Sequence, residues 1–269
     1  MRTHVAWIGA VSIVLTLGVA GAAIAQEWSI IDDDDWCRRE SWNADHCEVR
    51  EIVLSAGRDV IEVDGGKNGG ISVHGWDQDE IRLQVKIQVW DIDDDEAQEY
   101  ASRIEIDTGS VIEAQGPSRS KGPNWSASYR LRVPRESSLT LDTYNGGITI
   151  IDVTGEIEFS AKNGGIRLAH LGGDVRGATK NGGLDVVLAG DVWEGEGLDV
   201  ETTNGGVNVE VPKDYSARLL MSTVNGRVRA DYPVSVNGRR NTSIRATLGD
   251  GGPLIRLVTR NGGVVIRES

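Results

Sequence analysis

A short motif, Asn-Gly-Gly followed by aliphatic residues, recurs along this 269-residue chain and limits the folds that it can adopt. The copies read TYNGGITI from Thr143, AKNGGIRL from Ala161, TKNGGLDV from Thr179, TTNGGVNV from Thr202 and TRNGGVVI from Thr259. Most steps from one copy to the next are roughly 20 residues, and a nearly fixed period of this size is typical of a repeat architecture. The sequence therefore indicates stacked copies of one structural unit.

Each copy contains two short segments of alternating character. Before Asn204, for example, Leu198, Val200 and Thr202 alternate with Asp199 and Glu201, which is the pattern of a half-buried strand. The alternation resumes after the glycines. Asn and Gly tolerate positive φ, so the motif predicts a tight corner between two strands. The asparagines fall on the same parity as the buried aliphatic residues, which predicts an inward position.

We predict an all-β, single-domain parallel β-solenoid with Asn-Gly-Gly corners. Asn-Gly also favours two-residue antiparallel hairpins, which is the structural alternative. In a solenoid the aligned asparagines would form a hydrogen-bonded ladder. Its predicted members are Asn145, Asn163, Asn181, Asn204, Asn225 and Asn261.

The chain before the regular repeats is less uniform. We divide the β-solenoid domain, residues 48–269, into an irregular part, 48–135, and regular repeats, 136–269. Within the irregular part Ala97, Tyr100, Ala101 and Ile104 share one helical face, and acidic residues precede them. This pattern predicts one short helix near residues 94–103.

The first 25 residues are predicted to be a secretory signal peptide. Arg2 precedes a long apolar run, and Ala23-Ile24-Ala25 is a small-x-small cleavage site before Gln26. The alternative is an uncleaved membrane anchor, because the run is long enough to span a bilayer. With cleavage, no transmembrane segment is expected to remain. We therefore expect an exported protein, periplasmic or at the cell surface.

Residues 26–47 form an acidic segment rich in tryptophan. Its cysteines, Cys37 and Cys47, are predicted to form a disulfide, since the exported chain meets an oxidising compartment; free thiols are the alternative. Trp28, Trp36 and Trp42 indicate either a cap on the end of the solenoid or a platform for stacking sugars.

The charge distribution argues against several functions. A formal net charge of −13 disfavours binding to nucleic acid and to anionic membranes. In the aligned outward rows acids and bases alternate, and Glu158 beside Arg176 predicts a surface ion pair. We find no catalytic residues, no metal ligands and no cofactor-binding motif in the sequence. The chain is accordingly not expected to be an enzyme.

Longer stretches carry a family resemblance. YRLRVPRESSLTLDTYNGGITI, VPKDYSARLLMSTVNGRVRADYP and LGDGGPLIRLVTRNGGVVI, in this order, resemble the bacterial DUF4097 family of adhesin-like proteins. The resemblance extends from about Val49 to the C-terminus and implies an exported, solenoid-like envelope protein without a catalytic motif. The acidic leader departs from it.

These observations favour a non-catalytic adhesin-like or scaffold protein of the bacterial cell envelope, with a glycan or a protein as its partner. Two alternatives stay open. One is a polysaccharide-modifying β-helix enzyme, which would need clustered acids in a groove. The other is a sensor or regulatory subunit of an envelope-stress system.

Overall fold

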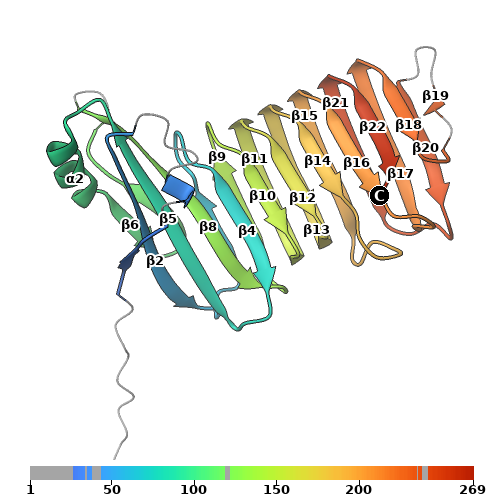
Figure 1. Ribbon diagram of the computed structural model, residues 1–269. Coiled ribbons are helices and arrows are strands. Elements are labelled where there is room, and N and C mark those ends of the chain that lie inside the picture. Colours follow the sequence, from blue (N-terminus) through green and yellow to red (C-terminus); the bar gives the residue numbers. More distant parts are fainter. Residues whose placement is uncertain (1–26, 34, 38–43, 119–121, 235, 238–241) are drawn as a thin grey trace, which may run out of the picture.

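The fold is predominantly β, with two eleven-stranded sheets that enclose an apolar core (Figure 1). The computed structural model describes residues 27–33, 35–37, 44–118, 122–234, 236–237 and 242–269. The predicted signal peptide lies outside these residues. Most strand pairs are parallel, and neither sheet closes on itself.

Strands that are neighbours in a sheet are often distant in the sequence. In spatial order, the first sheet contains β1 (Ser29–Ile31), β2 (His46–Ser55), β5 (Glu80–Trp90), β8 (Asn124–Pro134), β4 (Ile71–Trp76), β10 (Ile148–Ile151), β12 (Ile166–Ala169), β14 (Leu184–Val187), β16 (Val207–Val211), β22 (Val264–Glu268) and β18 (Val228–Asp231). In the same manner, the second sheet contains β19 (Val236–Asn237), β20 (Ser243–Leu248), β17 (Ala217–Asn225), β21 (Leu254–Asn261), β15 (Gly197–Asn204), β13 (Gly172–Asn181), β11 (Thr154–Asn163), β9 (Leu139–Thr143), β3 (Ile61–Asp64), β7 (Val111–Gln115) and β6 (Glu105–Thr108).

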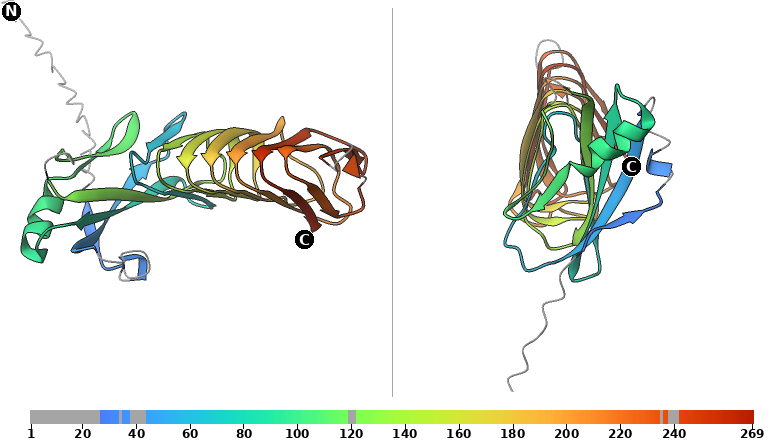
Figure 2. Two further views of the ribbon diagram at one scale, coloured as in Figure 1. Left: turned by 90° about the horizontal axis from the view of Figure 1, so that it is seen from above. Right: turned by 90° about the vertical axis from the view of Figure 1, so that its left-hand side faces the viewer.

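From β9 to β18 the chain passes alternately through the two sheets, and equivalent strands stack side by side (Figure 2). The pairing is parallel and in register, so Ile157 of β11 lies between Leu139 of β9 and Val175 of β13. β11 ends at Asn163 in the second sheet, and β12 begins at Ile166 in the first. The hairpin alternative is therefore wrong, because strands on either side of the motif pair with neighbouring repeats and not with each other.

The spatial order of the stack departs from the sequence order near the C-terminus. β21 lies between β15 and β17, and β22 lies between β16 and β18. β20 pairs antiparallel with β17 on its other side. The long interval before Asn261 is thus the chain that forms β19 and β20 before the last two strands return into the stack.

Side chains between the sheets form one continuous apolar core. The predicted alternation holds in β15, where Leu198 and Val200 are buried while Asp199 and Glu201 are exposed. Burial of apolar surface, worth about 25 cal/mol per Å², is the main stabilising contribution. Because inner residues stack on the same position of the next strand, each one packs against two neighbouring repeats.

Long antiparallel strands replace the parallel stack at the N-terminal end, where β5 pairs with both β2 and β8. The predicted helix is present as α2 (Asp94–Ser102), one residue shorter than expected, and it buries Ala97 and Tyr100. Arg50 of β2 donates to the carbonyl oxygen of Ala101 at 2.9 Å. A cation is favourable at the C-terminal end of a helix. No helix in the described part of the chain is long and apolar enough to cross a membrane.

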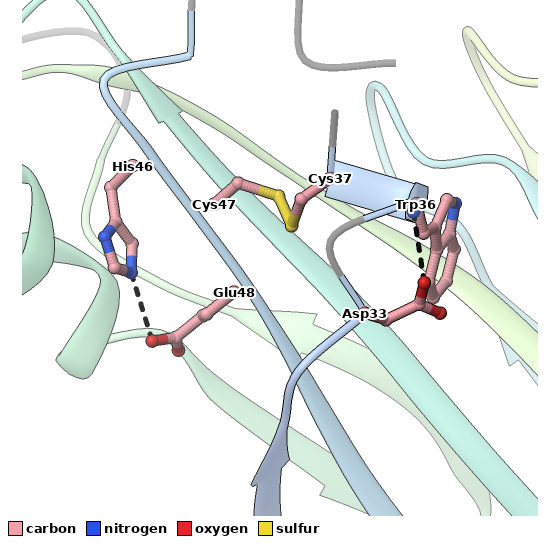
Figure 3. Close-up of a disulfide and its surroundings, with 6 residues drawn as sticks. All are labelled: Asp33, Trp36, Cys37, His46, Cys47 and Glu48. Atoms are coloured by element: carbon pink, nitrogen blue, oxygen red, sulfur yellow. Dashed lines mark hydrogen bonds and ion pairs between the residues drawn. A yellow bond between two sulfur atoms is a disulfide. The ribbon is translucent and has the colours of Figure 1, made fainter. Parts of the chain in front are cut away.

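A short strand and a disulfide fasten the N-terminal segment to the first sheet. β1 adds to the sheet as an edge strand and pairs antiparallel with β2. The predicted disulfide is present, joining Cys37 to Cys47 with the two Cα atoms 5.8 Å apart (Figure 3). Because Cys47 lies in β2, the bridge holds the segment beside the sheet.

The two described tryptophans of this segment, Trp28 and Trp36, do not form an exposed platform on which sugars could stack. Trp36 is 8% exposed, and its ring lies 4.0 Å from the guanidinium of Arg130 and 5.1 Å from the ammonium of Lys86. These partners come from the outer face of β8 and β5. Trp28 packs against the core, and Trp42 lies outside the described residues.

Candidate functional site on the outer face of the second sheet

Seven asparagine side chains form a continuous row of hydrogen bonds where the chain leaves the second sheet. Six of the seven donate through Nδ2 to the Oδ1 of a neighbour at 2.7–2.9 Å, and Asn68 at the end of the row accepts. We call this row the amide ladder; its members in spatial order are Asn68, Asn145, Asn163, Asn181, Asn204, Asn261 and Asn225. Asn68 belongs to a looser copy of the motif, KNGGISV, and was not among the predicted members.

The amide ladder lies at the surface, so the predicted inward position of the asparagines is wrong. In the repeat of Asn181, Thr179 is buried, whereas Lys180 and Asn181 are both exposed. Asn181 is the last residue of β13, and after it the chain leaves the second sheet and turns toward the first, so this last inward position lies at the edge of the core. Water competes for each exposed amide, which lowers the net contribution of a ladder bond to stability.

The first glycine of each motif is required by the close approach of the neighbouring repeat. A Cβ on Gly182 would lie 1.9 Å from the carbonyl oxygen of Gly164. The second glycine is less confined, since a Cβ on Gly183 would have its nearest contact at 3.5 Å, and Arg227 occupies that position in the repeat of Asn225. No motif glycine has a positive φ. The conformational reason predicted for these glycines is therefore wrong.

A buried threonine, two residues before the ladder asparagine, joins each repeat to the next. Its Oγ1 donates to the carbonyl oxygen of the first motif glycine in the neighbouring repeat, at 2.6–2.9 Å, in the cases of Thr143, Thr179, Thr202, Thr259 and Thr223. In the repeat of Asn163 this position is Ala161, which has no hydroxyl. The recurring threonine can be seen in the sequence. Which carbonyl oxygen it contacts, however, is set by the register of the stacked strands.

A hollow of about 520 Å³ lies on the outer face of the second sheet, across β9, β11, β13, β15 and β21. We call it the outer hollow. The hollow exists because the residues at its middle, Ser160, Gly177 and Ala178, have side chains too small to fill it. Its other lining residues are Thr140, Leu141, Asp142, Glu158, Phe159, Arg176, Asp199, Glu201 and Arg256.

Two arginines of the outer hollow are already paired. The guanidinium of Arg256 forms an ion pair with Asp199, and its Nη2 lies 3.8 Å from a carboxylate oxygen of Glu201. Arg176 pairs at 2.6 Å with Asp174 of its own strand. These contacts neutralise part of the charge around the hollow.

Two carboxylates of the outer hollow remain outside these pairs. Register places Glu158 beside Arg176, yet Arg176 pairs with Asp174, so the predicted Glu158–Arg176 ion pair is wrong. Neither Glu158 nor Asp142 forms an ion pair with any side chain that the structure describes. Both carboxylates are available to accept hydrogen bonds from a ligand.

A second hollow, of about 380 Å³, continues from the outer hollow toward the amide ladder. The two share lining residues of β9, β11 and β13. At the second one Lys162 Nζ donates to the Tyr144 hydroxyl at 2.6 Å and lies 4.1 Å from the centre of the Tyr144 ring. The hydrogen bond and charge of Lys162, with the charges of Lys67 and Lys180, lower the pKa of the Tyr144 hydroxyl.

The three histidines that the structure describes, His46, His74 and His170, line neither hollow. His46 is 3.1 Å from Glu48, and His170 is 2.9 Å from Asp152. Burial, with the charge of Arg132 next in importance, lowers the pKa of His74. Among the described residues no group of three or more His, Cys, Asp or Glu is placed to hold a metal ion.

Comparison with known proteins gives similarity in fold alone. No family model matches the sequence, and no curated protein matches it. In structure the chain is similar to a putative cell adhesion protein from Clostridium sporogenes, with a TM-score of 0.50 and 12% identity over 83% of this chain and 100% of that one. It is more distantly similar to putative adhesins from Bacteroides fragilis (TM-score 0.36, 11% identity, 82% of this chain and 97% of that one) and Parabacteroides distasonis (0.35, 10%, 81% and 96%). The chain thus shares the fold of the putative cell adhesion protein.

Proposed function

We propose that this chain is an exported, non-catalytic, adhesin-like protein of the bacterial cell envelope. In this proposal it is a parallel β-solenoid of the DUF4097 type that binds an envelope glycan or protein on the outer face of its second sheet. The fold shared with a cell adhesion protein supports the adhesin-like part. The Cys37–Cys47 disulfide supports export, because disulfides persist in oxidising compartments.

The observation that carries the proposal is the pair of joined hollows on one stacked face. In-register parallel strands repeat each outward position at about 4.8 Å, so the face presents rows of side chains. Such extended surfaces are how repeat proteins bind their partners. The rows carry paired arginines, Arg176 and Arg256, together with the unpaired carboxylates of Asp142 and Glu158, which suits recognition of polar groups over a long contact.

The test measures retention and turnover together. The full chain, expressed with its own leader, is incubated with cell-wall fragments and a glycan panel, and both bound material and released products are followed. We expect retention without products. Ala178→Tyr, which fills the outer hollow with a residue that strands favour, should abolish retention. The matched control, Arg167→Tyr, places the same side chain on β12 of the first sheet and should leave retention unchanged.

Equal retention by both variants would contradict the proposed face. A second candidate function has one observation in its favour, since Asp142 and Glu158 line the outer hollow outside its ion pairs. Glycoside hydrolysis uses such a pair of carboxyl groups. If the unaltered chain releases products steadily and Asp142→Asn, with its fold intact, does not, the proposed function changes from binding to catalysis.

A further inference from the structure

A column of mostly basic residues runs along the molecule beside the amide ladder. It consists of the residue just before each ladder asparagine, and we call it the edge column. In spatial order its members are Lys67, Tyr144, Lys162, Lys180, Thr203, Arg260 and Val224. Four of the seven are basic, although the chain carries a formal net charge of −13. Positive charge is therefore concentrated along the edge column, whereas the chain as a whole is acidic.

The register of the strands makes the edge column continuous. Lys162 and Lys180 stand on neighbouring strands, because Ala161 pairs with Thr179 and Asn163 with Asn181. Neighbouring positions in the column are therefore one strand spacing, about 4.8 Å, apart. At its N-terminal end the Asn145 amide donates to the Lys67 carbonyl oxygen at 3.0 Å, which places Lys67 beside Tyr144.

The basic residues of the edge column do not form ion pairs with carboxylates of the described chain. Within the described chain no ion pair joins Lys67, Lys162, Lys180 or Arg260 to an acidic side chain, whereas Arg256 and Arg176 nearby are both paired. Lys162 is instead held by the hydroxyl and ring of Tyr144. This hydrogen bond from Lys162, and then the charges of Lys162, Lys67 and Lys180, lower the pKa of the Tyr144 hydroxyl.

The amide ladder adds neutral donors along the same line. An asparagine amide has two N–H groups, and the ladder uses one of them in each member that donates. The other N–H can donate to a hydroxyl. On the opposite side of the edge column Asp142 lines the second hollow and can accept from one. A ligand lying along this line thus meets cations in the middle and hydroxyl partners on both sides.

We propose that the edge column and the amide ladder bind a linear acidic polysaccharide, such as a polymer of uronic acids, laid across the strands. The inference rests on the proposed function and names the class of its ligand. One strand spacing is comparable to the length of one sugar in an extended chain, so the carboxylates of such a chain can reach Lys67, Lys162, Lys180 and Arg260, which stand at the first, third, fourth and sixth positions of the column. Nucleic acid fits less well, because the acidic remainder of the surface repels a densely charged backbone. A single line of cations is also narrower than a membrane surface requires.

The experiment uses two polymers that differ in charge alone. Polygalacturonate oligomers are immobilised beside the same oligomers after reduction of their carboxyl groups, and the full chain is applied to both. We expect retention on the acidic polymer, weakening with added salt, and none on the neutral one. Lys162→Gln/Lys180→Gln should lower the affinity about tenfold, as two exposed ion pairs are lost.

The matched control is Arg167→Gln/Arg229→Gln, which changes the net charge equally on the first sheet, where both residues are exposed. It should bind the acidic polymer like the unaltered chain, and thermal unfolding of both variants verifies the fold. Equal weakening by the two double variants, or equal retention on both polymers, would overturn the inference. If the unaltered chain ignores polygalacturonate but is retained on cell-wall fragments, the inference fails while the proposed function stands. If it is retained on neither, both fail.

Discussion

The regular stack and the N-terminal region of this molecule hold their strands together in different ways. In the stack, three contacts recur from repeat to repeat: the ladder bond, the close approach at the first glycine, and the threonine bond to that glycine's carbonyl. In the N-terminal region each fastening occurs once, as with Arg50 at the end of α2 or Trp36 over Arg130.

This difference predicts different responses to damage. Stability in a stack of repeats is approximately a sum of equal terms between neighbours, so most single losses remain modest. A contact that occurs only once in the N-terminal region has no equivalent contact that could compensate for its loss. Within the stack, the exception is a change that forces two neighbouring backbones apart. Such a change weakens all the contacts between those two repeats at once, so its effect on stability is large.

The largest effect is expected for Gly182→Ala. Its Cβ would lie 1.9 Å from the Gly164 carbonyl oxygen, so the two repeats must move apart. We expect a loss of about 3 kcal/mol or more in the free energy of unfolding, measured with chemical denaturant. Gly183→Ala is the matched control and should change stability by less than about 0.5 kcal/mol. Similar losses for both would refute the close-approach explanation.

The next effect concerns a fastening that occurs once. Replacing Cys37 and Cys47 together by alanine opens a loop with a sequence separation of 10 residues, and the loss should be about 2.5 kcal/mol. Because the bridge lies in the N-terminal region, amides of β1 and β2 should exchange faster with solvent while those of β13 and β15 stay protected. Uniform loss of protection would show that the two regions unfold as one unit. Mass spectrometry without reduction should find the bridged chain two hydrogens lighter than the reduced chain.

The same comparison explains which parts of the structure the sequence could predict. The alternation around Leu198 and Val200, and the spacing of the asparagines, repeat often enough to predict parallel strands in register and the members of the ladder. The helix at Asp94–Ser102 was predicted from its own local pattern. Contacts that occur once left no such signal, so the contact of Trp36 with Arg130 and Lys86 was not foreseen.

Register explains the remaining errors. The parity rule placed Asn181 inside, because nothing local to Thr179-Lys180-Asn181 tells that burial ends at the threonine although β13 continues to Asn181. The reason for Gly182 lies in Gly164, on a different repeat. The outer hollow was missed for the same reason, since Asp142 and Glu201 line one hollow only because the stack aligns β9 with β15. The recurrence of small residues at Ser160 and Ala178 was its available signal.

A smaller effect is expected for the threonine bond. Thr202→Val removes the bond to the Gly182 carbonyl oxygen, 2.8 Å long, and leaves that partly buried carbonyl without this partner. We expect a loss of about 1.5 kcal/mol. Ala161 offers the reverse experiment, because Ala161→Thr supplies the missing hydroxyl and should add about 0.5 kcal/mol or more. Destabilisation by both changes would show that the position responds to shape rather than to the hydrogen bond.

The smallest effect tests whether the ladder contributes as a sum of equal bonds. Asn181 lies within the ladder, donating to Asn163 and accepting from Asn204, whereas Asn225 at the end donates to Asn261 and accepts from no other member. Each bond is exposed, so its net contribution should be about 0.5 kcal/mol. Asn181→Ala should therefore cost about 1 kcal/mol and Asn225→Ala about half of that, measured in the same denaturant titration. Equal losses would mean that the amides act singly, through their own repeats, and that the row contributes alignment without adding stability from one repeat to the next.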